Sequence, residues 1–211
     1  MLYFLVKSNY ISHKENVMNL RILSTKTVII VALLLISIIS KVFAQVKDIS
    51  TNNNESQKFT KVLQLAESGD AQAQFEVACA YQTGRGVNVD DQKAVKWLSK
   101  AAEQGLVAAE TALGSAYDIG MGVPLNNQKA IFWWQKAARH GSNYALKCLG
   151  YSYIEGRGVE QSNLYAYAIW QQLPPNDEEA VDVMKALRKN LSADDVSKAE
   201  KMTLDDIFET K

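Results

Sequence analysis

The stretch YDIGMGV at Tyr117–Val123 decides how this chain is read, because it occurs twice more in nearly the same form. The other copies are YQTGRGV at Tyr81–Val87 and YIEGRGV at Tyr153–Val159, and the step between copies is 36 residues each time. Residues 66–173 align at that period without a gap. The chain therefore contains three tandem units of one supersecondary type.

Each unit carries two segments with helical apolar spacing. In the first unit they are Ala73, Val77, Ala78 and Tyr81, then Ala94, Trp97, Leu98 and Ala101. Gly84 is predicted to end the first helix in the left-handed conformation, and Asp90 or Asp91 to cap the second. A single hairpin cannot bury both faces, so the units must stack. The expected fold is all-α: an α/α right-handed solenoid of stacked helical hairpins.

The Gly-x-Gly loops are predicted to be turns rather than phosphate sites. A dinucleotide fingerprint follows a strand, whereas each loop here follows a helix. The order Gly-x-x-x-Ala, Leu-Gly-x-x-Tyr, Gly-x-Gly-Val and Ala-x-x-Trp-x-x-Lys-Ala-Ala resembles the Sel-one-like repeat (SLR) family, a relative of the tetratricopeptide repeats. The second unit matches almost throughout, from Gly105 to Ala138. The first departs at Ala78, where the family has glycine, and the third has Ile169 where it has tryptophan.

The flanks of the repeats are predicted to be helical caps with polar outer faces, which keep a solenoid soluble. Phe59, Val62 and Leu65 fall in the register of a second helix, and Ser192 is predicted to cap a helix over Ala193–Met202. The predicted organisation is a signal peptide at 1–44, a linker at 45–54, an N-terminal capping helix at 55–68, repeats at 66–101, 102–137 and 138–173, and C-terminal capping helices at 174–211.

The N-terminal 44 residues have the pattern of a secretory signal. An apolar run of 13 residues, 28–40, follows basic residues and precedes small residues at Val42 and Ala44. The run is shorter than the roughly 20 residues of a membrane span, although an uncleaved anchor in the inner membrane is the alternative. Met18 is a second possible start. The expected address is periplasmic or secreted, with no stable membrane span after cleavage.

Cleavage after Ala44 changes the charge of the chain. It leaves 18 basic and 22 acidic side chains, a net charge of −4. A mildly acidic protein without a basic run gives no electrostatic footprint for nucleic acid. His140 is then the one remaining histidine, and its place before Gly141 is typical of a solvated loop.

No catalytic, metal or cofactor site is predicted. Some exported members of the family that the chain resembles carry a β-lactamase or penicillin-binding label, which implies a Ser-x-x-Lys nucleophile. No serine here has lysine three positions later. The two cysteines, Cys79 and Cys148, lie on first helices two repeats apart, too distant for the roughly 7 Å that a disulfide allows. Buried thiols or an intermolecular bond are the alternatives.

The surface predicted to bind a partner is the concave face of the first helices. It comprises Gln72, Glu76, Cys79, Thr83, Ser115, Ile119, Tyr144, Tyr151 and Glu155. Tyr144 and Tyr151 would anchor an extended peptide or a helix, or else pack on the C-terminal cap. The leading hypothesis is an exported, non-enzymatic scaffold that binds a protein or peptide in envelope signalling or host interaction. The alternative is an envelope enzyme acting on peptidoglycan or β-lactams.

Overall fold

The computed structural model describes residues 37, 39–43 and 54–209. The predicted signal peptide at 1–44 and linker at 45–54 lie almost wholly outside these residues. Two compact units are distinguished, residues 1–53 and 54–211, and only the second is described at length. Among the described residues, none of the helices combines the length and the apolar character that crossing a membrane requires.

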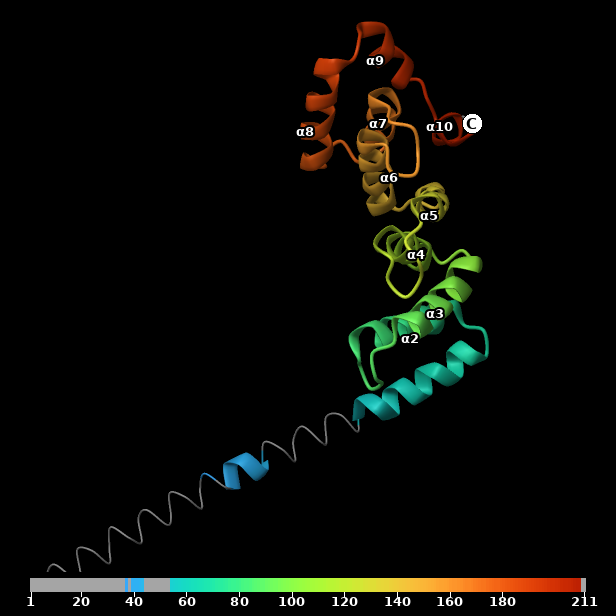
Figure 1. Ribbon diagram of the computed structural model, residues 1–211, viewed down its shortest axis with the longest axis vertical. Coiled ribbons are helices and arrows are strands. Elements are labelled where there is room, and N and C mark those ends of the chain that lie inside the picture. Colours follow the sequence, from blue (N-terminus) through green and yellow to red (C-terminus); the bar gives the residue numbers. More distant parts are fainter. Residues whose placement is uncertain (1–36, 38, 44–53, 210–211) are drawn as a thin grey trace, which may run out of the picture. The chain divides into compact units, whose positions relative to one another are not determined.

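Residues 54–209 form helices joined by short loops, with no strand in that range (Figure 1). Three helical hairpins follow one another, and each helix packs on the next along the chain. We call the first helix of a hairpin helix A and the second helix B. The pairs are α2 (Ala71–Thr83) with α3 (Asp91–Glu103), α4 (Val107–Ile119) with α5 (Asn127–Arg139), and α6 (Asn143–Glu155) with α7 (Asn163–Trp170). The predicted all-α hairpin fold is confirmed.

The turns of the repeat have the chemistry that the sequence predicts. Gly84 ends α2 with φ 73° in the left-handed region. The side chain of Asp90, rather than Asp91, accepts the backbone N–H of Lys93 and so caps α3. The loop between the two is a turn between helices, without a preceding strand.

The second glycine of each loop allows two backbones to touch. A Cβ built on Gly122 would lie 2.2 Å from the carbonyl oxygen of Asp91, the first residue of α3. A Cβ built on Gly158 would lie 2.7 Å from the backbone of Asn127, the first residue of α5. Each loop therefore rests on the start of the preceding helix B, at a distance that no residue with a side chain can match.

Within the second and third repeats a tryptophan of helix B packs on a glycine of helix A. A Cβ on Gly114 would lie 2.5 Å from the indole of Trp134, and one on Gly150 would lie 2.3 Å from that of Trp170. Both indoles are buried. The first repeat has Ala78 and Leu98 at the two equivalent positions, so the departure from the family glycine is matched by a smaller partner.

Helices also precede and follow the three hairpins. Residues 54–67 form a helix, here called the capping helix, which packs through Phe59, Val62 and Leu63 on α2. After α7 the chain forms α8 (Glu178–Leu187), a 3-10 turn (Arg188–Asn190), α9 (Ala193–Ala199) and α10 (Leu204–Phe208). The largest buried cluster joins these last helices to α6 and α7 through residues such as Leu173, Val196 and Ile207.

The sequence prediction was wrong on detail in the C-terminal region. It placed one helix over 193–202, whereas α9 ends at Ala199 and a further helix, α10, begins at Leu204. The signal for α10 is Thr203 with Asp206 three residues later. Their side chains and backbones exchange hydrogen bonds in a capping box, which satisfies N–H groups at the start of the helix.

Candidate functional site

None of the nine residues predicted to bind a partner is buried. Six of them are exposed and three are half-buried: Gln72, Glu76, Thr83, Ile119, Tyr144 and Glu155 in the first group, Cys79, Ser115 and Tyr151 in the second. All nine lie on helices A. The structure does not gather them into one site. Seven of them lie in three separate surroundings, Glu155 takes part in a contact between repeats, and Thr83 donates to the carbonyl oxygen of Cys79 one turn earlier on α2.

The first surrounding is a pocket of about 410 Å³ between the capping helix and α2. Gln72, Glu76 and Cys79 line it from α2, with Phe75 and Ala80 beside them. The other wall comprises Glu55, Lys58, Phe59 and Val62 of the capping helix, and Arg85 of the first Gly-x-Gly loop closes one end. The lining thus combines apolar side chains with charged side chains of both signs.

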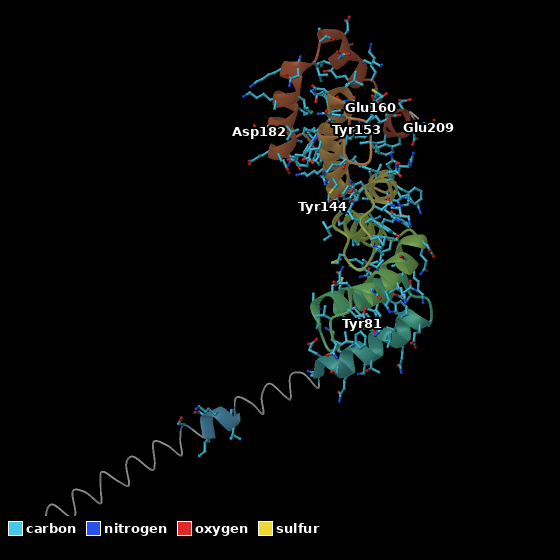
Figure 2. All side chains as sticks on the ribbon, viewed as in Figure 1. Tyr81, Tyr144, Tyr153, Glu160, Asp182 and Glu209 are labelled. Atoms are coloured by element: carbon cyan, nitrogen blue, oxygen red, sulfur yellow. The ribbon has the colours of Figure 1, made fainter. Side chains whose placement is uncertain are left out.

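The second surrounding is the exposed ring of Tyr144 on the first turn of α6, labelled in Figure 2. Its side chain is 61% exposed, and the side chains of Ser115 and Cys148 lie near its hydroxyl group. The charge that Cys148 would carry as a thiolate raises the pKa of Tyr144, and partial burial raises it further. Ile119, one turn after Ser115 on α4, is 66% exposed.

The third surrounding is the C-terminal cap, and it holds Tyr151. The Tyr151 hydroxyl donates to Glu179 Oε1 at 2.9 Å, and its ring meets the Trp170 indole edge-on at 5.1 Å between centroids. Glu179 belongs to α8. Of the two roles left open for the predicted tyrosine pair, Tyr151 therefore packs on the cap, whereas Tyr144 does not.

Ionic contacts hold that cap against α6. Lys147 Nζ lies 2.8 Å from Asp177 and 2.7 Å from Glu179. The hydrogen bonds from Lys147 hold the pKa of both carboxyl groups below their usual values and raise the pKa of Lys147 itself. These residues serve the fold at the end of the stack.

Glu155, at the end of α6, takes part in a contact between repeats. It pairs with Arg157 of the third Gly-x-Gly loop, and the Arg157 guanidinium reaches both carboxylate oxygens of Asp118 at 3.0 and 3.3 Å. Asp118 is the penultimate residue of α4. Met121 has the equivalent position in the second loop, and its sulfur lies 3.9 Å from Gln82 Nε2 of α2. The middle residue of these loops thus contacts the preceding helix A.

The sequence analysis missed a buried carboxylate. Glu110 on α4 is fully buried, and its Oε2 lies 2.8 Å from Nδ1 of His140. Its Oε1 has no hydrogen-bond partner, with Lys136 Nζ at 3.8 Å. His140 is exposed, as the sequence had suggested, but its ring is also held by a buried acid.

The first repeat has the same contact in neutral form. Gln104 donates to Gln74 at 2.8 Å, and these residues stand 36 positions before His140 and Glu110. Gln74 is buried as well, and it donates to the carbonyl oxygen of Ala66. The sequence signal for this contact is a pair of polar residues 30 positions apart that recurs 36 residues later. The repetition indicates that the Glu110–His140 pair belongs to the packing of the repeat.

The two cysteines are free and half-buried. Burial raises the pKa of the Cys148 thiol to about 11, and burial also raises that of Cys79. Thiols with such values carry little thiolate near neutral pH and are poor nucleophiles. In the described part of the chain no three His, Cys, Asp or Glu side chains are grouped as metal ligands would be.

Comparison with known proteins identifies the repeat. The family model described as Sel1 repeat matches residues 71–106, 107–142 and 149–173. A search of curated protein sequences gave no significant match.

Two solved structures share the fold. The first is c5321, described as a protective antigen present in uropathogenic Escherichia coli strains that displays an SLR fold. It is 33% identical with a TM-score of 0.61 over 68% of this chain. The second is a Sel1 repeat protein from Oxalobacter formigenes, 28% identical with a TM-score of 0.55 over 66% of this chain. The matched parts cover 31% of the first protein and 66% of the second. The chain therefore contains three Sel1 repeats, and its helical hairpins share the SLR fold of these solved structures.

Proposed function

We propose that this protein is an exported adaptor that binds a protein or peptide partner on the exposed face of its helices A, centred on Tyr144 and Ile119. Sel1-repeat proteins generally mediate protein–protein interaction. The pattern of residues 1–44 supports export, and envelope signalling or host interaction is the setting proposed for the partner.

The observation that carries the proposal is the exposure of Tyr144. An aromatic ring with 61% of its surface in water is unusual on a helix whose neighbours bury their large side chains. Tyrosine anchors of this kind contribute much of the energy of protein interfaces, since they give a large contact area at low entropic cost.

Ile119 extends this exposed area along α4. It lies one turn beyond Ser115, and Leu125, which follows in the next loop, is 62% exposed. Together they would offer a partner an aromatic anchor beside aliphatic surface, which is typical of the centre of an interface.

The test is affinity capture of a partner from the native cell envelope with the wild-type protein and with Tyr144→Ala. We expect the substitution to weaken binding of the captured protein about tenfold or more, as loss of an anchor residue does. Tyr151→Ala is unsuitable, because Tyr151 holds α8.

The matched control is Phe132→Ala. Phe132 is an aromatic residue of α5 with 54% of its surface exposed, on a helix B rather than a helix A. A partner that is lost equally from both variants, or from neither, contradicts the assignment of the binding face.

A further inference from the structure

Within residues 54–209, no helix A precedes the first helix B of the stack. The capping helix is equivalent to helix B of a repeat: Glu55 contacts Gly86, as Asp91 contacts Gly122 and Asn127 contacts Gly158. Within the described residues, however, the chain of the second unit begins at this helix. The repeats of the same protein therefore show what would normally cover it.

The face of the capping helix that would meet a helix A is left open. Val62 has the position of Trp134 and Trp170, the two residues that pack on their own helix A. One turn to either side lie Lys58 and Leu65 on the same face. In the repeats these two positions hold buried residues: Ala94, Ala130 and Ala166 for the first, and Ala101, Ala137 and Leu173 for the second. Leu65 is instead 57% exposed, and Lys58 is exposed.

Helix α2 shows the same lack of cover. Ala80 is only half-buried, whereas the equivalent residues Ala116 and Ser152 of later repeats are fully buried. Those two residues belong to helices A that follow another helix A. The pocket of about 410 Å³ described above lies between the open sides of α2 and the capping helix, bounded by Val62 and Ala80.

Arg85 marks the end of the missing helix. Its equivalent Arg157 binds Asp118, the penultimate residue of the preceding helix A. The side chain of Arg85 forms no ion pair with any described residue. Lys58 lies near the start of the capping helix, so in an antiparallel hairpin it too would face the last turn of a helix A. Two cations thus meet at the place where that helix would end.

The remaining charges of the pocket indicate which side chains a docked helix would need along the rest of its length. Glu76 lines it from the middle of α2, and Glu55 lies beside Lys58 at the edge. A helix that runs parallel to α2 would meet Glu76 about two turns before its acidic end.

We propose that an amphipathic helix of a partner protein docks between the capping helix and α2 as a helix A in trans. Small apolar residues face Val62 and Leu65, a basic or neutral polar residue faces Glu76, and Asp or Glu in the last turn binds Arg85 and Lys58. The proposal rests on the proposed function in that both require a protein partner, but it concerns a different surface.

The experiment uses a helix taken from the protein itself. The probe is a side-chain-stapled, fluorescent peptide with the α2 sequence, in which Cys79→Ala removes the thiol and Gln82→Asp places an acid at the position of Asp118. The control peptide retains Gln82. We expect the full-length protein to bind the acidic peptide about fivefold more tightly, by fluorescence anisotropy, and Arg85→Gln to abolish that difference.

Two exposed aliphatic residues supply the second arm. Leu65→Asp should abolish binding of the acidic peptide, whereas Val181→Asp, at an exposed aliphatic residue of α8 outside the pocket, should leave that binding unchanged. Circular dichroism checks that each variant is folded. If either of these variants is unstable, a charge reversal replaces this arm. Arg85→Asp should weaken binding of the acidic peptide, and a peptide that carries Arg in place of the acid should bind this variant again.

Three results would overturn the proposal: equal affinity for the two peptides, no effect of Leu65→Asp, or no binding of either peptide. A photo-cross-linker at position 65 in intact cells gives a further check. Cross-links to a second copy of this chain or to the chain's own residues 1–53 would assign the site to another occupant. Tyr144→Ala should not alter peptide binding, so this proposal and the proposed function can fail separately.

Discussion

At the scale of single residues, the pairing of a helix A glycine with a helix B tryptophan shows how the repeats differ without changing fold. Gly114 and Gly150 admit Trp134 and Trp170 to a distance that excludes a methyl group. Ala78 stands opposite Leu98 instead. The two choices fill the same space in different ways, so neither position can be changed alone without overpacking or leaving a cavity.

We predict strong coupling between these two positions. Gly114→Ala should lower the free energy of unfolding by about 2 kcal/mol, because the clash with Trp134 outweighs the gain in helix propensity. Trp134→Leu alone should cost about 3 kcal/mol through the cavity that it leaves. The double variant reproduces the first repeat and should be more stable than the sum predicts by about 1 kcal/mol or more.

Urea denaturation of the four proteins gives the double-mutant cycle. Ala78→Gly is the control, since it removes a methyl group opposite the smaller Leu98 and should cost only about 1 kcal/mol. Additive effects at Gly114 and Trp134 would show that the close contact carries no energetic weight.

At the scale of elements, the cap on the third repeat is fastened by charges as well as by apolar packing. Lys147 of α6 binds both Asp177, which caps α8, and Glu179 in its first turn. The pKa of each carboxyl group is lowered in the folded protein. A carboxyl group whose pKa is lower in the folded state stabilises the protein at any pH above its unfolded-state pKa. This stabilisation is lost as the pH falls through its folded-state pKa.

We therefore predict that the docking of α8 weakens in acid. Lys147→Gln should lower the melting temperature at pH 7, and the difference from the wild type should shrink as the pH falls below about 4 and through the lowered pKa of the two carboxyl groups. Differential scanning calorimetry across this range measures the effect. Lys185→Gln, at an exposed lysine of α8, is the control, and a pH-independent effect of Lys147→Gln would refute the ionic account.

At the scale of the whole molecule, the hairpins and their turns could be predicted because the 36-residue period repeats both the helical spacing and the glycines. The partners of single side chains could not. Tyr151 and Tyr144 lie seven residues apart on one face, yet only Tyr151 meets the cap, because Glu179 in the first turn of α8 accepts a hydrogen bond from the Tyr151 hydroxyl. The burial of Glu110 was hidden for a related reason: a carboxylate at the start of a helix is typical of solvent, and only its neighbours enclose it.

The C-terminal helices complete the stack, and their removal should show it. Termination after Leu191 deletes α9 and α10, and with them the buried residues Val196, Ala199 and Ile207. We expect the free energy of unfolding to fall by about 3 kcal/mol or more, with increased aggregation as Trp170 and Leu173 gain exposure.

Asp205→Asn is the control for this truncation. It breaks only the exposed pair between Arg139 and Asp205 and should change stability by no more than about 0.5 kcal/mol. Urea denaturation and light scattering provide the measurements. A truncated protein as stable as the wild type would mean that α7 ends the cooperative unit.

The contact of the second and third Gly-x-Gly loops with the preceding helix A has a consequence for how such a chain can evolve. The glycine and tryptophan of one repeat lie inside the same unit, so a duplicated or deleted unit inherits both. Two other contacts join residues of neighbouring units: Gln82 with Met121, and Asp118 with Arg157. Loss of the middle unit would join Gln82 to Arg157 and leave the arginine without its acid. A change in the number of repeats therefore keeps the contacts within each unit, whereas the contacts between units depend on which repeats are neighbours.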